Sequence, residues 1–206
     1  MIERTVTASV HGRYLLEERS AERVLVGFHG YAETAESCLE EMLRIPGLDR
    51  WSLVSVQALH PFYTRAGTVV ASWMTRLQRD HAIDDNVAYV QRVIEDLPPA
   101  QTLVFIGFSQ GAPMAARAAT RAARAAGLIL LGGELPPEIF EDRHVQMPPT
   151  LLARGSRDEW YTDEKFKHDL NWLESRTRVA RCVFAGGHEW SDAFREAAGE
   201  FLQSLE

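Results

Sequence analysis

The sequence lacks the features that would place it in a membrane, in an export pathway or in a disulfide-stabilised scaffold. Its longest apolar stretch, Ala125–Leu131, is much shorter than the roughly 20 residues that cross a bilayer. The first residues, Met1–Thr5, contain no apolar segment of the kind found in signal peptides. Cys38 and Cys182 are the two cysteines of the chain, too few for a disulfide framework. We therefore expect a protein of the reducing cytoplasm that does not insert into membranes.

The sequence also lacks an excess of positive charge and the short motifs of metal and nucleotide chemistry. It has 22 Lys and Arg against 29 Asp and Glu, a net charge of −7, which gives no general attraction to nucleic acid. No HExxH, paired CxxC, Walker loop or GxGxxG is present. We therefore predict no metal, no cofactor and no nucleic-acid partner.

What the sequence does have is an alternation of strand-like and amphipathic helical segments along most of its 206 residues. Such alternation predicts parallel strands joined by helical crossovers, with helices on both faces of the sheet. The length suits a single domain over residues 1–206 without a separate cap domain. The predicted strands are Val24–His29, Trp51–Val56, Thr102–Ile106, Leu128–Leu131, Thr150–Ala153 and Arg181–Phe184.

Helices are predicted between these strands, and an antiparallel hairpin before them. The hairpin would pair Thr5–Ser9 with Tyr14–Glu17 across His11-Gly12-Arg13. Two long connections, 57–82 and 132–149, interrupt the regular pattern, and long connections are usually functional or contain short elements of their own. The predicted helices are one with apolar positions at Leu39–Leu43 that ends at Pro46-Gly47, one from near Asp84 to Pro98, and Gln110–Ala126, Asp163–Ser175 and Ser191–Leu205.

The most informative residues are Gly107–Gly111, which match G-x-S-x-G between a predicted strand and a predicted helix. The tight reversal at Ser109 leaves no room for side chains at the two flanking glycines. The serine hydroxyl is thereby held at the start of a helix, where backbone N–H groups favour a developing oxyanion. An ordinary Gly-Ser turn is the alternative, and the strand-and-helix context favours a nucleophile.

A serine nucleophile needs a base, and the base needs an orienting carboxylate. In this type of sheet the order is serine, acid, histidine, and three histidines follow Ser109. His168 falls within a helix and His144 in a polar stretch, whereas His188 follows Gly186-Gly187 beyond the last strand. Strand-end loops carry the chemistry of such sheets. We therefore predict His188 as the base.

The acid should follow an earlier strand in a loop. Asp158 does so after the glycine turn at Gly155, and it is our predicted acid. Its neighbour Glu159 is the main competitor, and Glu134 and Asp142 in the preceding loop are weaker ones.

The oxyanion hole normally combines the N–H after the nucleophile with an N–H from a loop after an early strand. The first is Gln110, and Gly30 lets the chain turn so that Tyr31 N–H supplies the second. His29 precedes the nucleophile and ends a buried strand. We interpret it as a structural histidine that holds this loop.

Taken together, these segments resemble the phospholipase/carboxylesterase branch of the α/β-hydrolase superfamily, which includes acyl-protein thioesterases and is similar to dienelactone hydrolases. The resemblance rests on Phe28–Tyr31, Gly107–Gly111, Gly155–Asp158 and Gly186–His188, with His11–Tyr14 similar to the opening hairpin of that family. It implies an α/β-hydrolase fold and cofactor-free hydrolysis of carboxylic esters or thioesters. The dienelactone branch uses a cysteine nucleophile, which this elbow lacks.

Two departures from the family pattern concern the pocket. Trp160-Tyr161 stands after the acid where a small aliphatic residue is usual, and Glu134 follows Gly132-Gly133. Trp73, Trp160 and Tyr161 are candidate substrate contacts, with packing in the core as the alternative.

Arginines at helical spacing follow the elbow at Arg117, Arg121 and Arg124. We expect a solvated outer face there, with recognition of an anion as the alternative. Arg65, Arg76 and Arg79 in the long connection are further candidates for contact with a charged substrate.

The sequence thus predicts a serine hydrolase acting on a small-molecule ester or thioester through an acyl-enzyme on Ser109. A peptidase or another amide or C–C hydrolase would use the same residues, and a catalytically silent binding protein is the third reading. Whether the chain forms a homodimer stays open.

Overall fold

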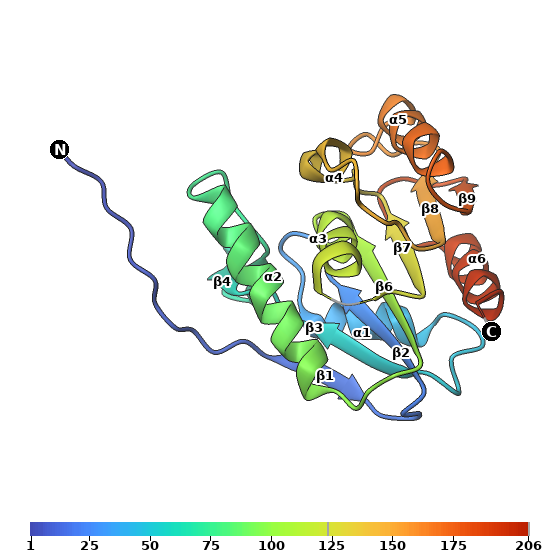
Figure 1. Cartoon of the computed structure of the whole chain (residues 1–206), viewed down its shortest axis with the longest axis horizontal. Coiled ribbons are helices and arrows are strands. Elements are labelled where there is room, and N and C mark those ends of the chain that lie inside the picture. The colour runs from blue at the N-terminus through green and yellow to red at the C-terminus, as the bar shows by residue number, and fades with distance from the viewer. Residues whose placement is uncertain (123, 206) are drawn as a thin grey trace.

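A seven-stranded sheet forms the centre of the molecule (Figure 1). The computed structural model describes residues 1–122 and 124–205. The strand order is β1-β3-β2-β6-β7-β8-β9, with β1 antiparallel to β3 and all other neighbours parallel. Its strands are β1 (Tyr14–Glu17), β2 (Arg23–Phe28), β3 (Ser52–Val56), β6 (Thr102–Phe108), β7 (Gly127–Leu131), β8 (Thr150–Gly155) and β9 (Val179–Phe184).

Helices cover both faces of this sheet, as predicted (Figure 1). α1 and α6 pack on one face, and α2, α3, α4 and α5 pack on the other. The helical elements are α1 (Ala35–Leu43), α2 (Arg79–Asp96), α3 (Gly111–Arg117), the π-helical segment η1 (Ala118–Ala122), α4 (Pro137–Glu141), α5 (Asp163–Glu174) and α6 (Asp192–Gln203).

The core therefore consists of two apolar layers, one on each side of the sheet. Successive residues of the buried strand β6 alternate between them: Phe105 lies in the layer with α2 and α3, and Ile106 in the layer with α1 and α6. A strand buried on both faces is expected to be apolar throughout, which is the pattern of Leu103–Phe108. This double burial fixes the strand ends from which the site residues emerge.

The predicted N-terminal hairpin is not formed. Tyr14–Glu17 is a strand, but its antiparallel partner is β3, with Tyr14 opposite Val56. Thr5–Ser9 is exposed and outside any strand, in an arm that extends away from the sheet (Figure 1). Strand formation depends on packing against a neighbouring surface. The side chains of residues 5–9 are exposed, so this segment does not form the predicted strand.

The long connection 57–82 contains a hairpin of its own. β4 (His60–Tyr63) and β5 (Val69–Ser72) pair antiparallel, outside the main sheet. α2 begins at Arg79, five residues before the predicted start at Asp84, and its first turn has no side-chain cap. The connection between β3 and α2 therefore contains short regular elements of its own.

The alanine-rich helix after the elbow is shorter than predicted. It is α-helical from Gly111 to Arg117 and π-helical from Ala118 to Ala122, whereas Gln110–Ala126 was expected; residue 123 lies outside the described residues. A π-helical segment accommodates one more residue per turn than the α-helix. No helix within the described residues combines the length and apolar character needed to cross a membrane.

Candidate active site

Ser109 lies in a strained turn between β6 and α3. Its φ is +54°, a left-handed conformation that is costly for a residue with a side chain. A Cβ on Gly107 would come within 2.2 Å of the Gly111 carbonyl oxygen, and one on Gly111 within 2.0 Å of the Phe28 carbonyl oxygen. Both glycines are therefore required where the sequence predicted them, because the elbow packs directly against neighbouring backbone.

His188 connects Ser109 to Asp158. Its Nε2 lies 2.8 Å from Ser109 Oγ, and its Nδ1 lies 2.8 Å from Asp158 Oδ2. The three residues follow the carboxyl ends of β6, β8 and β9, and the topology brings these ends to one edge of the sheet. The structure thus brings together the nucleophile, acid and base candidates that the motif order had selected.

The competing histidines and acids are not part of these contacts. The His168 side chain is exposed on α5 and His144 is exposed in the loop after α4, so neither approaches Ser109. Glu159 is exposed beside Asp158. Glu134 lines the same pocket as His188, but its carboxylate is paired with Lys165 Nζ at 3.0 Å, and His188 Nδ1 is bonded to Asp158.

Backbone N–H groups of the turn after β8 bind the Asp158 oxygen that does not contact His188. Oδ1 accepts hydrogen bonds from the backbone N–H groups of Trp160 and Tyr161, each at 2.9 Å. This leaves Oδ2 for His188. The carboxylate is 1% exposed, so the two amides replace water as the partners that a buried carboxylate requires.

Two backbone amides beside Ser109 are available to a ligand. Gly30 N–H donates to Glu33 Oε2 at 2.7 Å. Among the described residues, however, none accepts a hydrogen bond from Tyr31 N–H or Gln110 N–H. These are the donors predicted for the oxyanion hole.

The side chain of Glu33, which accepts the Gly30 N–H, is itself partly buried. Burial raises the pKa of Glu33, while the Gly30 hydrogen bond opposes this shift.

His29 holds the loop that carries Tyr31. Its Nε2 accepts the Ala58 N–H at 3.1 Å, and its Nδ1 lies 2.7 Å from the Gly30 carbonyl oxygen. The first contact requires an unprotonated Nε2, so the ring proton is on Nδ1 and is donated to Gly30. Burial lowers the pKa of His29, which keeps the ring neutral. The structural role predicted for this histidine is confirmed.

The side chain of Gln110 has a role that sequence reasoning missed. Its Oε1 accepts hydrogen bonds from Trp73 N–H and Ser72 Oγ–H, at 2.9 and 3.2 Å. Its Nε2 donates to the Met74 carbonyl at 3.0 Å. The amide side chain therefore fixes the segment after β5 to the elbow.

Trp73 supports the loop at His29 from within the core and does not line the pocket. The side chain is fully buried, and its Nε1 donates to the His29 carbonyl at 2.8 Å. The sequence had suggested Trp73 as a substrate contact; its neighbour Met74 is at the pocket wall instead. Trp73 and Met74 follow the end of β5 outside regular structure, so a sequence pattern does not tell which of the two side chains lines the pocket.

A pocket of about 370 Å³ opens beside Ser109. The predicted contacts Trp160 and Tyr161 both line it. Trp160 is 75% exposed at the rim, whereas Tyr161 is buried and donates its hydroxyl to Asp169 Oδ2 at 2.9 Å. Asp169 Oδ2 also accepts Leu135 N–H and was not found from the sequence. It holds two walls of the pocket together.

Arg117 differs from its sequence-based interpretation. Arg121 and Arg124 are exposed, as expected for an outer helix face, but the Arg117 side chain is completely buried. Its Nε donates to Glu138 Oε1 at 2.6 Å, and it lines the same pocket as Ser109. In an alanine-rich helix the apolar face is broad, so spacing alone did not separate Arg117 from the solvated arginines.

This arrangement is suited to nucleophilic acyl transfer. A base within hydrogen-bond reach of a hydroxyl, with the far side of its ring held by a buried carboxylate, can take the hydroxyl proton as the oxygen attacks a carbonyl. The free amides can donate hydrogen bonds to the carbonyl oxygen and so stabilise the negative charge that develops on it. In the described part of the chain, no group of three or more His, Cys, Asp or Glu side chains is placed to hold a metal ion.

Solved structures share this fold over nearly their whole length. The acyl-protein thioesterase 2 of Zea mays matches with a TM-score of 0.76 at 17% identity, over 95% of this chain and 99% of that one. The Bacillus cereus carboxylesterase matches with a TM-score of 0.74 at 17% identity, over 95% of both chains. A phospholipase/carboxylesterase from Dyadobacter fermentans matches with a TM-score of 0.72 at 22% identity, over 96% of this chain and 100% of that one. The fold is thus that of the α/β-hydrolase esterases.

The family is shown by a sequence match rather than by these superpositions. No curated protein sequence matches this chain. A family model described as serine hydrolase (FSH1), however, matches residues 20–189. This range is well over half of the chain, and it includes the elbow, the acid turn and His188. The chain belongs to the serine hydrolase (FSH1) family.

Proposed function

We propose that this serine hydrolase cleaves small carboxylic esters or thioesters through an acyl-enzyme on Ser109. The observation that carries the proposal is the position of His188, which is 2.8 Å from Ser109 Oγ on one side and 2.8 Å from Asp158 Oδ2 on the other. The fold shared with carboxylesterases and a thioesterase supports the ester or thioester class. This chemistry needs neither metal nor cofactor.

The reaction has two halves. His188 Nε2 takes the Ser109 proton as the serine oxygen attacks the carbonyl carbon, and the N–H groups of Tyr31 and Gln110 bind the oxyanion. The protonated His188 then gives this proton to the leaving alcohol or thiol. In the second half His188 activates a water that releases the acid, while Asp158 keeps the ring in the tautomer with the proton on Nδ1. Trp160 and Tyr161 contact the substrate at the pocket wall.

The test has two parts: Ser109 is replaced, and the kind of bond in the substrate is varied. Ser109→Ala is expected to abolish hydrolysis of p-nitrophenyl butyrate, and a fluorophosphonate probe is expected to label the wild-type protein at Ser109. Wild-type rates in Ser109→Ala, or labelling elsewhere, would refute the proposal. A panel of matched esters, thioesters and anilides separates esterase from amidase activity, and faster cleavage of the anilide would reverse the ranking.

A further inference from the structure

The pocket beside Ser109 carries an excess of positive charge. Three cationic side chains line it and one anionic side chain does so: Arg79, Arg117 and Lys165 against Glu134. Lys165 and Glu134 form an ion pair at 3.0 Å, so their charges largely cancel. Arg117 is paired with Glu138 at 2.6 Å and Arg79 lies 3.8 Å from Asp80, but neither of these carboxylates lines the pocket. A pocket for a neutral acyl chain needs neither arginine.

Arg117 is the more unusual of the two because it is buried and incompletely paired. Its side chain is 0% exposed. Nε is bonded to Glu138, and Nη1 lies 4.0 Å from Met114 Sδ. Among the described residues, Nη2 finds no hydrogen-bond partner. Leaving a buried donor of a charged group unpaired is costly, and an anionic ligand in the pocket would supply the missing acceptor.

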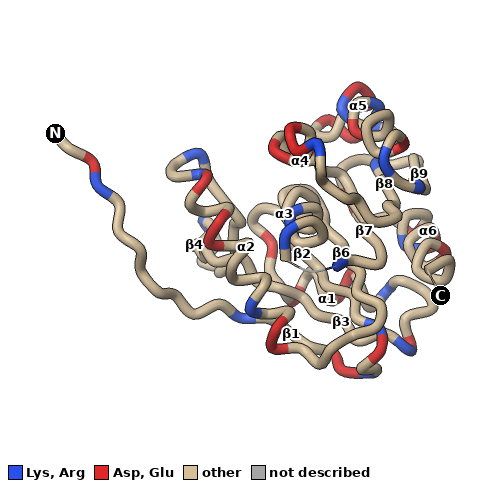
Figure 2. Tube along the Cα trace, viewed as in Figure 1, with Lys and Arg blue, Asp and Glu red and all other residues tan. Residues whose placement is uncertain are grey.

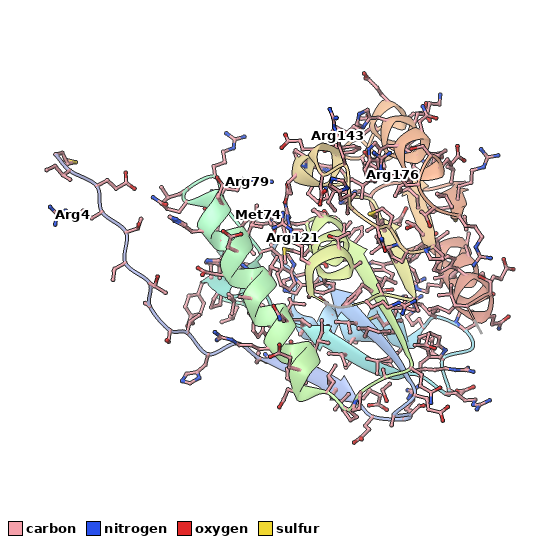
Figure 3. All side chains as sticks on the ribbon, in the orientation of Figure 1. Arg4, Met74, Arg79, Arg121, Arg143 and Arg176 are labelled. Carbon is pink, nitrogen blue, oxygen red and sulfur yellow. The ribbon has the colours of Figure 1, made fainter. Side chains whose placement is uncertain are left out.

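Arg117 has two further arginines near it besides its partner Glu138. In Figure 3, Arg79 lies at the start of α2 and Arg121 follows α3, on the elements that flank Arg117. Burial lowers the pKa of Arg117, Arg79 and Arg121 lower it further, and Glu138 opposes them. Arg121 Nη2 also lies 3.9 Å from Glu138 Oε1. One carboxylate thus lies near two guanidinium groups. Figure 2 shows acidic positions on α4 and charges of both signs along α5.

The Arg117 side chain runs back toward the N-terminal end of α3. Side chains on a helix lean toward its N-terminus, and the contact of Nη1 with Met114 shows this backward course. Met114 lies three residues after Gly111, the first residue of α3, or about 4.5 Å along the axis at about 1.5 Å per residue. A short acyl chain attached at Ser109 covers such a distance.

We propose that this pocket selects an acyl group that ends in a carboxylate, so that the preferred substrates are monoesters or monothioesters of short dicarboxylic acids. Arg117 and Arg79 bind the free carboxylate, while the ester carbonyl lies at Ser109. The acyl part is assigned to this side because Arg117 belongs to the helix that follows Ser109, whereas the leaving group departs toward His188, which protonates it. The inference rests on the proposed esterase function.

The kinetic test compares substrates that differ in one charge. kcat/KM is measured for monophenyl adipate and for phenyl hexanoate, with Ser109→Ala giving the background of each. The wild type is expected to prefer the adipate, and Arg117→Gln to lower the ratio of the two kcat/KM values by about ten- to hundredfold, as expected for a lost hydrogen bond to a charged group. Arg143→Gln removes the same charge at an exposed site that does not line the pocket and is expected to leave the ratio unchanged.

Because Arg117 is buried, a second variant guards against misfolding. Arg79 is 43% exposed, so Arg79→Gln is expected to fold and to lower the same ratio by about two- to fivefold. An unchanged ratio in both variants would overturn the proposal. So would a stronger preference for 4-carboxyphenyl hexanoate, which carries the charge on the leaving group.

A binding measurement decides the inference separately from the reaction. Adipate and hexanoate are titrated into Ser109→Ala by calorimetry. Tighter binding of adipate that weakens at least tenfold in Ser109→Ala/Arg117→Gln supports the carboxylate site, even if no ester is hydrolysed. Equal or absent binding of both acids refutes it, even if neutral esters are good substrates. Failure of the esterase proposal and failure of this inference are therefore distinguishable.

Discussion

The side chain of Gln110 accepts a hydrogen bond from the backbone N–H of Trp73 at 2.9 Å, across 37 residues of sequence. Gln110 N–H is one of the two donors proposed for the oxyanion, and the Gln110 side chain holds the segment that carries Met74. The geometry of the elbow and the position of the pocket wall are linked through one amide.

Gln110→Ala is accordingly expected to damage both stability and activity. It removes the side-chain bonds to Ser72, Trp73 and Met74, each with a net contribution of about 1 kcal/mol. Urea unfolding should show a loss of about 2–3 kcal/mol, and KM should rise because Met74 is no longer fixed. Gln91→Ala is the control, because Gln91 has an exposed bond to Glu95; if both variants behave alike, the bracing role of Gln110 is wrong.

Asp158 and Glu159 are neighbouring carboxylates that we expect to contribute very differently. Asp158→Asn keeps the shape of the side chain but no longer favours the tautomer of His188 that can accept the Ser109 proton, so kcat on p-nitrophenyl butyrate should fall about a thousandfold or more. Glu159 is exposed, and Glu159→Gln should stay within about twofold of the wild type. A large loss in Glu159→Gln with little loss in Asp158→Asn would reassign the acid.

His29 should make the protein less stable in mildly acidic solution. Burial lowers the pKa of the folded His29, so the unfolded chain binds this proton more readily, and the free energy of unfolding falls as the pH drops below the unfolded value of about 6.5. The free energy of unfolding stops falling once the pH is below the pKa of His29 in the folded protein. One such group gives a slope of at most about 1.4 kcal/mol per pH unit.

Urea denaturation between pH 5 and pH 8 measures this effect. His29→Gln, which retains an acceptor for Ala58 N–H, should show a shallower dependence than the wild type. His144→Gln changes an exposed histidine and should follow the wild-type curve. Parallel curves for all three proteins would show that His29 is not the group responsible.

Replacing Gly111 or Gly67 by alanine separates two destabilising effects, a steric clash at Gly111 and an unfavourable backbone conformation at Gly67. A Cβ at position 111 would lie 2.0 Å from the Phe28 carbonyl oxygen, whereas one at position 67 meets nothing within 4 Å, although φ there is +81°. Gly67→Ala should therefore cost about 1 kcal/mol. Gly111→Ala should cost several times more, or prevent folding, since backbone must move; soluble yield and thermal melting distinguish the two.

The sequence predicted the sheet and the residues around Ser109 because both have local signals. β6 is a short apolar run that ends at a glycine turn, and Asp158 and His188 each follow such a run in the order expected for this fold. Local signals failed where the structure depends on distant surfaces. The strand Tyr14–Glu17 could not reveal that its partner is β3, because the pairing joins residues about 40 positions apart.

The pocket was the least predictable part for the same reason. Whether Trp73 or Met74 faces the substrate depends on the hydrogen bonds of Gln110, and whether Arg117 is solvated depends on Glu138 in α4. Each partner is far away in sequence and has no motif of its own. The triad candidates follow from spacing, whereas the residues that line the pocket could be identified only from the packed structure.

Ser109 lies two residues before the first residue of α3, and Arg117 is the last residue of that helix. The separation of the two residues is therefore a property of helical backbone and not of the surrounding loops. If the carboxylate is bound as proposed, the optimal acyl length is set by this rigid spacing. Substitutions at Trp160 or in the β4–β5 hairpin should alter rates without moving that optimum, whereas inserting one residue into α3, between Gly111 and Arg117, should displace it.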